Sequence, residues 1–151
     1  MADPGNPPPA TTSKPDPSQL PPEALDLAHK IFDLARNGDT AAVASYVDAG
    51  ISANLTNDAG DTLLMLAAYH GHAETVTLLL ERGADPNSLN DKGQSPIAGA
   101  VFKGHTEVVK ALVKGGADSE AGRPSAADAA KIFKRDDLLK IIEEGKQPET
   151  G

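Results

Sequence analysis

The sequence predicts an all-α repeat solenoid: about four helix–turn–helix units stacked side by side and joined by hairpin-like arms. The main evidence is a period of 33 residues, since segment 58–72 returns as 91–105 with matching glycines and apolar positions. A fixed period of this length is typical of stacked units, none of which can bury its apolar face alone. Aromatic residues make up only 3% of the chain. The core is therefore expected to consist of Ala, Leu, Val and Ile, which let helices approach closely.

The period divides the chain into a repeat domain, expected over 23–145, and two tails. The units run over about 25–57, 58–90, 91–123 and 124–145. The fourth unit is three residues shorter, as expected of a terminal unit on whose outer side nothing stacks. Residues 1–22 hold eight of the twelve prolines and predict a disordered leader, with a polyproline ligand as the alternative. Residues 146–151 are expected to be a flexible tail.

The first helix of each unit has a recognisable start and end. Ser95 is a good N-cap, and Pro96 suits the first helical position because its missing N–H would be unpaired there. Thr62 begins the equivalent helix one unit earlier. Glycines able to adopt the left-handed conformation are expected to end these helices: Gly38, Gly71 and Gly104. The fourth unit has Lys134 at this place, so its turn is expected to be closed differently.

The second helix follows at once, with apolar residues at helical spacing. Val76, Leu79 and Leu80 return one period later as Val109, Leu112 and Val113. Acidic residues at the start of the helix, such as Glu74 and Glu107, favour its dipole. Glycines stop it at Gly50, Gly83 and Gly116. The following segment, 84–93, is polar and rich in Asn, Asp and Gly, which predicts a tight reversal in a hairpin-like arm.

These residues resemble the ankyrin repeat. Its pattern, Gly-x-Thr-Pro-Leu-His-x-Ala-Ala-x-x-Gly-His-x-Glu-Val-Val-x-Leu-Leu-Leu-x-x-Gly-Ala-Asp-x-Asn, lies over residues 60–87, and the resemblance covers about 25–144. The first histidine of the pattern is replaced by Met65 and Ala98 in the two central units, so the loop-bracing hydrogen bond attributed to it is lost. Glu120 replaces the terminal Asn in the third unit, whose hairpin is therefore expected to be looser or shorter.

The resemblance implies a non-catalytic binding module. In such stacks the hairpin tips and the exposed face of the first helices form a concave contact surface, and the second helices line the outside. Tyr69 and Phe102 lie one period apart and are expected side by side on adjacent units. The alternative is that such an aromatic only packs on the neighbouring loop. The positions carried over as protein-binding are Arg36, Asp58, Ala59, Asp61, Tyr69, His70, Asp91, Lys92, Gln94, Phe102 and Lys103.

Catalysis, a metal and a cofactor are not expected. His70 and His72 place two imidazoles close together, but zinc needs three or four ligands, and these side chains flank a helix-ending glycine and should diverge. His72 recurs as His105, which favours a role in bracing the start of the second helix. Cysteine is absent. Catalytic acids need unlike environments, whereas the repeated carboxylates of this chain have like ones.

The partner is expected to be a protein. A net charge of −8 argues against direct binding to nucleic acid or to anionic membranes. With acidic tips at Asp58, Asp61 and Asp91, a basic segment is a candidate target for an adaptor, escort or inhibitor. We expect a monomer, because four units with polar ends bury their own faces. We expect it in the cytoplasm, with the nucleus as a second location, since neither a secretory signal nor an apolar run of about 18 residues is present.

Two alternatives to this function remain open. A structural or assembly module would bind through its outer helices or tails and leave the concave face idle. A metal-dependent hydrolase would need stoichiometric zinc. The repeat pattern indicates how the chain binds, whereas a few variable side chains decide what it binds.

Overall fold

The computed structural model of the protein describes residues 22–146, without side-chain detail at 22–25 and 146. The tail at 147–151, and the predicted Pro-rich leader up to residue 21, lie outside the described residues. Within the described part, the chain forms eight helices in four pairs. Their bounds are α1 Pro22–Asn37, α2 Thr40–Asp48, α3 Leu63–Tyr69, α4 Ala73–Glu81, α5 Pro96–Lys103, α6 Thr106–Lys114, α7 Ala126–Ile132 and α8 Asp136–Lys146.

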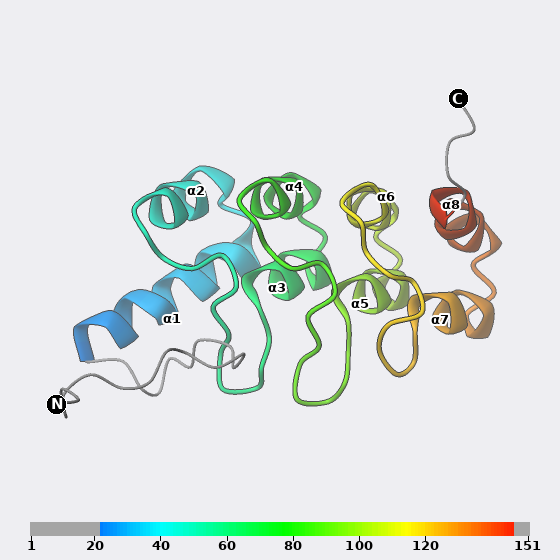
Figure 1. The fold of residues 1–151 in the computed structure, drawn as a ribbon, viewed down its shortest axis with the longest axis horizontal. Coiled ribbons are helices and arrows are strands. Elements are labelled where there is room, and N and C mark those ends of the chain that lie inside the picture. Colours follow the sequence, from blue (N-terminus) through cyan, green and yellow to red (C-terminus); the bar gives the residue numbers. More distant parts are fainter. Residues whose placement is uncertain (1–21, 147–151) are drawn as a thin grey trace, which may run out of the picture.

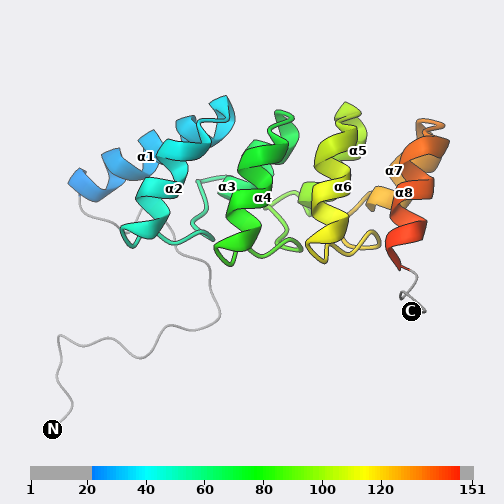
Figure 2. The ribbon, with the colours of Figure 1, turned by 90° about the horizontal axis from the view of Figure 1, so that it is seen from above.

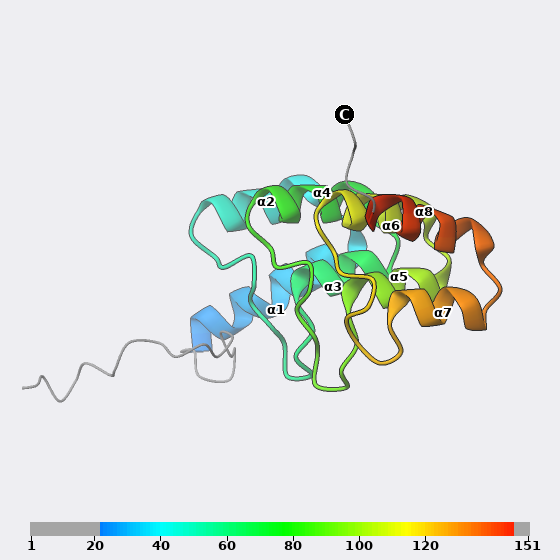
Figure 3. The same cartoon turned by 45° about the vertical axis from the view of Figure 1, so that its right-hand side comes forward.

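The helices form two layers (Figure 1). The first helices of the pairs, α1, α3, α5 and α7, lie in one layer, and each contacts the next along the row. The second helices, α2, α4, α6 and α8, form the other layer in the same order. Hairpin arms extend beyond the first-helix layer (Figure 3). The prediction of an all-α repeat solenoid is confirmed. None of the helices in residues 22–146 has the length and apolarity that crossing a membrane requires.

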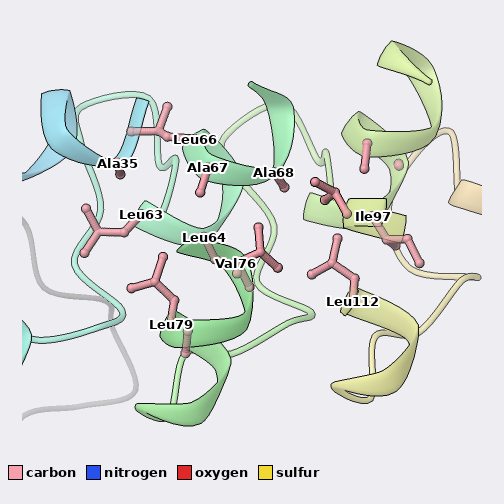
Figure 4. Packing of buried hydrophobic residues seen from close by; sticks show 14 of the residues in the cluster. Ala35, Leu63, Leu64, Leu66, Ala67, Ala68, Val76, Leu79, Ile97 and Leu112 are labelled. Atoms are coloured by element: carbon pink, nitrogen blue, oxygen red, sulfur yellow. The ribbon is translucent and has the colours of Figure 1, made fainter. Parts of the chain in front are cut away.

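The core runs continuously through the stack, because each pair covers the apolar face of its neighbour. Leu63 and Leu64 of α3 and Val76 and Leu79 of α4 are fully buried and fill the space between these helices (Figure 4). Burying one such side chain contributes about 1.5–3 kcal/mol. Small residues at the helix contacts, such as Ala67, keep the layers close. The expected core of Ala, Leu, Val and Ile is confirmed, with Phe32 of α1 as a large aromatic addition.

Hydroxyl side chains cap the first helices as predicted. The Oγ1 of Thr62 accepts a hydrogen bond from the backbone N of Met65 at 3.1 Å. The Oγ of Ser95 accepts one from the N of Ala98 at 3.1 Å, with Pro96 at the start of the helix. These caps satisfy amides that have no partner within the helix, so losing one typically costs about 1 kcal/mol.

The first helices end in left-handed turns. The predicted glycines adopt positive φ angles, 74° at Gly38, 83° at Gly71 and 77° at Gly104. Lys134 also adopts the left-handed conformation, with φ at 56°. The backbone N of Arg135 then donates to the O of Ala130 at 2.8 Å, the bond that His105 makes one unit earlier. The expectation of a different closure in the fourth unit was therefore wrong. Packing of α7 against α8 holds the same turn, although a non-glycine residue there costs about 1–2 kcal/mol.

The arms are hairpins that hydrogen-bond to one another. In the first arm the N of Asn57 donates to the O of Asp61 at 3.0 Å, and in the second the N of Asn90 donates to the O of Gln94 at 3.1 Å. The N of Asp91 bonds across to the O of Ala59 at 3.0 Å. The third arm is shorter, as predicted: 11 residues (115–125) separate α6 from α7, against 14 (82–95) between α4 and α5.

Candidate protein-binding surface

The stack has two long edges, because α3, α5 and α7 each run from a hairpin arm to a short turn (Figure 2). The hairpin edge consists of the arm tips at 57–61, 90–94 and 118–123. The turn edge consists of the C-terminal ends of the first helices and the turns after them, at 36–38, 69–71, 102–104 and 131–135. The predicted contact residues divide between these two edges. Most of them are exposed, and Arg36 and Asp61 are half-buried.

At the hairpin edge, several polar side chains are already hydrogen-bonded within or between the arms. The Oδ1 of Asp61 accepts a hydrogen bond from the Nδ2 of Asn90 at 2.8 Å. The Oε1 of Gln94 accepts another from the same amide at 2.8 Å. These two predicted contact residues therefore link or brace hairpins. Asp58 and Asp91 are exposed at the tips, and the carboxylate of Asp91 lies over Gly60 of the preceding arm.

At the turn edge, the predicted aromatics are exposed, Tyr69 to 43% and Phe102 to 57%. They lie on the neighbouring helices α3 and α5, but each has another partner. The Nζ of Lys103 lies 5.2 Å from the centroid of the Tyr69 ring. The rings of Phe102 and Phe133 lie 5.4 Å apart, at 76° to each other. Tyr69 and Phe102 thus lie on adjacent, contacting helices as expected, but their rings pair with other residues.

The contacts between neighbouring units are offset by one position. Each of these rings meets the residue one position later in the next unit instead of its own equivalent. Lys103 stands in that relation to Tyr69, and Phe133 stands in that relation to Phe102.

Two large apolar residues of this surface were missed from the sequence, Ile132 at 65% exposure and Phe133 at 47%. Because the fourth unit is three residues shorter, Ile132 takes the place of Phe102, and Phe133 takes the place of Lys103. Carrying the repeat alignment through this unit would have found them. Four of the five exposed large apolar side chains in the described part of the chain lie on the turn edge. Exposed apolar surface is therefore concentrated at this edge.

His72 and His105 tie adjacent turns together. The Nε2 of His72 lies 2.7 Å from the backbone O of Arg36, and that of His105 lies 3.0 Å from the O of Tyr69. Neither ring caps its own helix, although both residues stand at the N-cap position. Each ring instead braces the start of its second helix by anchoring it to the preceding unit. Across residues 22–146 no group of three or more His, Cys, Asp or Glu side chains is arranged to hold a metal ion.

The pKa of His70 is affected by the other basic side chains of the turn edge. This pKa is lowered from the ordinary value, first by partial burial and then by the neighbouring basic side chains of His72, Arg36, Lys103 and His105. These groups come from three successive units. Basic side chains of three units therefore gather at the C-terminal ends of the first helices, on a chain whose net charge is −8.

A pocket of about 320 Å³ lies between α1 and the first hairpin. It brings together three predicted residues, Arg36, Asp58 and Ala59, that are separated along the chain. The Nη1 of Arg36 lies 2.6 Å from the Oδ1 of Asp33, so the charges of this pocket are mixed. The full lining is His29, Phe32, Asp33, Arg36, Asn57, Asp58 and Ala59.

Comparison with known proteins agrees with this architecture. A Pseudomonas aeruginosa protein, whose name describes it as an ankyrin repeat protein, is 49% identical over 67 residues, which are 44% of this chain and 39% of that protein. The match thus spans about two fifths of the relative's length. The family described as ankyrin repeats (3 copies) matches residues 31–122, more than half of the chain. With its repeated helix pairs, hairpin arms and left-handed turns, the chain belongs to the ankyrin repeat family.

Proposed function

We propose that this protein is a non-catalytic binding module, acting as an adaptor, escort or inhibitor, that holds a protein partner on its hairpin arms and first helices. Ankyrin repeats are in general protein–protein interaction modules and typically lack catalysis. The observation that supports this assignment is the exposure of Tyr69 and Phe102 on successive units. Exposed aromatics at the centre of an interface often contribute 2 kcal/mol or more when truncated.

The hairpin edge is suited to a basic part of such a partner. Asp58 and Asp91 are exposed, and neither forms an ion pair within residues 22–146. The net charge of −8 would attract a basic partner at long range and raise its association rate. Each exposed ion pair adds only about 0–1 kcal/mol, so affinity depends mainly on the apolar contacts.

The test is capture of partners from the native cell on the immobilised full chain, followed by titration of the partner identified. The double variant Tyr69→Ala/Phe102→Ala is expected to lower partner affinity at least about tenfold, equivalent to 1.4 kcal/mol. The matched control is Thr77→Ala/Lys114→Ala, which truncates two exposed side chains on α4 and α6 of the outer layer. It should leave affinity within about twofold.

The opposite result would favour an assembly module that binds through its outer helices. In that case Tyr69→Ala/Phe102→Ala would leave affinity unchanged, and the outer-layer variant would weaken it. Sedimentation of the free chain tests the accompanying proposal that it is a monomer, since a dimer would place one layer in a self-interface.

A further inference from the structure

We infer that the turn edge binds an acidic peptide segment carrying an apolar anchor residue. The surface is a strip, here called the turn-edge strip, that crosses the last three helix pairs. This inference rests on the proposed function and specifies the chemistry of the partner at one of the two edges. The strip consists of Tyr69, Phe102, Lys103, Ile132, Phe133 and Lys134.

The apolar part of the strip is continuous across units. Lys103 covers one face of the Tyr69 ring, and Phe102 packs edge-on against Phe133. Each ring is thus partly covered by the next unit. Ile132 occupies the equivalent position in the last described pair and is the most exposed of the set, at 65%. An apolar side chain of a partner would bury these groups together at roughly 25 cal/mol per Å².

The positive charges of the strip are available to a partner. Lys103 and Lys134 are exposed, and neither forms an ion pair among the residues that the structure describes. The neighbouring arginines differ in this respect, because Arg36 binds Asp33, and Arg135 binds Asp137 through two hydrogen bonds of 3.1 and 2.9 Å. The two lysines of the strip can therefore pair with a carboxylate without breaking an existing ion pair. Lys131, at the same edge, is likewise exposed and in no ion pair within the described residues.

Two features argue against a binding site for an acidic peptide at this edge. Acidic residues stand at the starts of the second helices on the same edge, namely Glu74, Glu107 and Asp136. They lie toward the second-helix layer, and Glu107 is 3.7 Å from the Nζ of Lys110. Basic residues in the last turn also stabilise a helix through its dipole, which accounts for cations such as Lys103. The dipole does not account for the exposed rings beside them.

The spacing of the units suits an extended peptide. Neighbouring helices lie about 8–10 Å apart, and three residues of extended chain span about 10 Å. Carboxylates three residues apart can therefore reach Lys103 and Lys134, with an apolar residue between them over Phe102 and Phe133. Nucleic acid is a poorer occupant, because its affinity depends on neutralising many phosphates and this edge also carries acidic groups.

The experiment uses the full chain and short synthetic peptides. The probe has a central Phe-Leu pair flanked on each side by two glutamates, and its counterpart has lysines at the glutamate positions. Amide shifts in NMR titrations report both affinity and location. The glutamate peptide is expected to bind at least about tenfold tighter than the lysine peptide, and to shift the amides of Gly71, Gly104 and Lys134.

Charge reversal identifies the cations. Lys103→Glu/Lys134→Glu should weaken the glutamate peptide about tenfold. The control Lys114→Glu/Lys140→Glu makes the same change in charge on α6 and α8, at exposed positions away from the strip, and should change affinity less than about twofold. Similar thermal unfolding of the two variants would show that folding does not explain the difference.

Several outcomes would overturn the inference. These are failure of the glutamate peptide to bind, equal or tighter binding of the lysine peptide, shifts confined to the hairpin edge, or no loss on reversing Lys103 and Lys134. Preferential binding of single-stranded oligothymidylate through the same amides would identify a nucleic-acid surface. Self-association lost in Phe102→Ala/Phe133→Ala would identify a second copy as the occupant. If the captured partner needs Tyr69 and Phe102 but tolerates the lysine reversals, the proposed function stands and this inference fails.

Discussion

The hairpin edge and the turn edge reverse the same chain by different means. At the hairpin edge, side chains satisfy the backbone: the Oδ1 of Asn57 accepts hydrogen bonds from the amides of Ala59 and Asp61, and Asn90 does the same one unit later. Left-handed glycines occur at both edges, but at the turn edge the amides of the reversal, such as those of Gly71 and His72, bond to backbone carbonyls instead of to an Asn side chain. Side chains beside these turns are therefore left available for recognition.

The charges of the two edges follow this difference. The hairpin tips present carboxylates such as Asp58 and Asp91, together with side chains held within the arms. The turn edge presents aromatic rings and lysines that make few bonds of their own. One chain can thus offer an acidic and a cationic surface to different parts of a partner, although its net charge is strongly negative. The contrast can be tested edge by edge.

The largest effect is expected from placing alanine in the turn. Gly71 has φ at 83°, and an added Cβ would lie 2.9 Å from the His105 ring. Gly71→Ala should therefore lower the free energy of unfolding by about 2–3 kcal/mol, combining backbone strain with displacement of that ring. Gly93, at the hairpin edge, has φ at 75° but open space around it, so Gly93→Ala should cost only about 1 kcal/mol. Urea unfolding of both variants checks the difference, and equal losses would mean that the histidine ring is not a steric constraint.

A smaller effect of opposite sign is expected in the fourth unit. Lys134 holds a left-handed conformation that glycine adopts without strain. Lys134→Gly should raise the free energy of unfolding by about 0.5–1 kcal/mol, since the relieved strain exceeds the added entropy of the unfolded chain. Thermal unfolding measures it, with Lys131→Gly, within helix α7, as a control that should instead destabilise. A loss of stability in Lys134→Gly would show that this turn does not need the left-handed conformation.

The smallest effect concerns His70. Its pKa in the folded protein is lowered, so in the window below the ordinary value the unfolded chain binds more protons than the folded one. Its contribution to stability is therefore complete above the ordinary pKa and is lost as the pH falls from that value through the lowered pKa of the folded protein. NMR titration of the ring should show the lowered pKa, and Lys103→Gln should raise it. A pKa of His70 that is unchanged in Lys103→Gln would show that Lys103 does not contribute to the field at this ring.

Much of the fold could be predicted because its signals are local. The caps at Thr62 and Ser95 and the glycine turns each depend on a few neighbouring residues. The period of 33 residues predicts that the units stack. The candidate surface was only partly predictable. Tyr69 and Phe102 were found by their repeated position, whereas Ile132 and Phe133 were hidden by the shortened fourth unit.

By itself the sequence determined the family, the order of the helix pairs and the places where the chain turns, since propensities, caps and apolar periodicity act within one unit. The tertiary structure decided which side chains meet between units. It placed Lys103 on Tyr69 and Phe133 on Phe102, directed His72 to the preceding turn, and forced Lys134 into the glycine conformation. These contacts depend on the distance and offset between packed helices, which no single unit encodes.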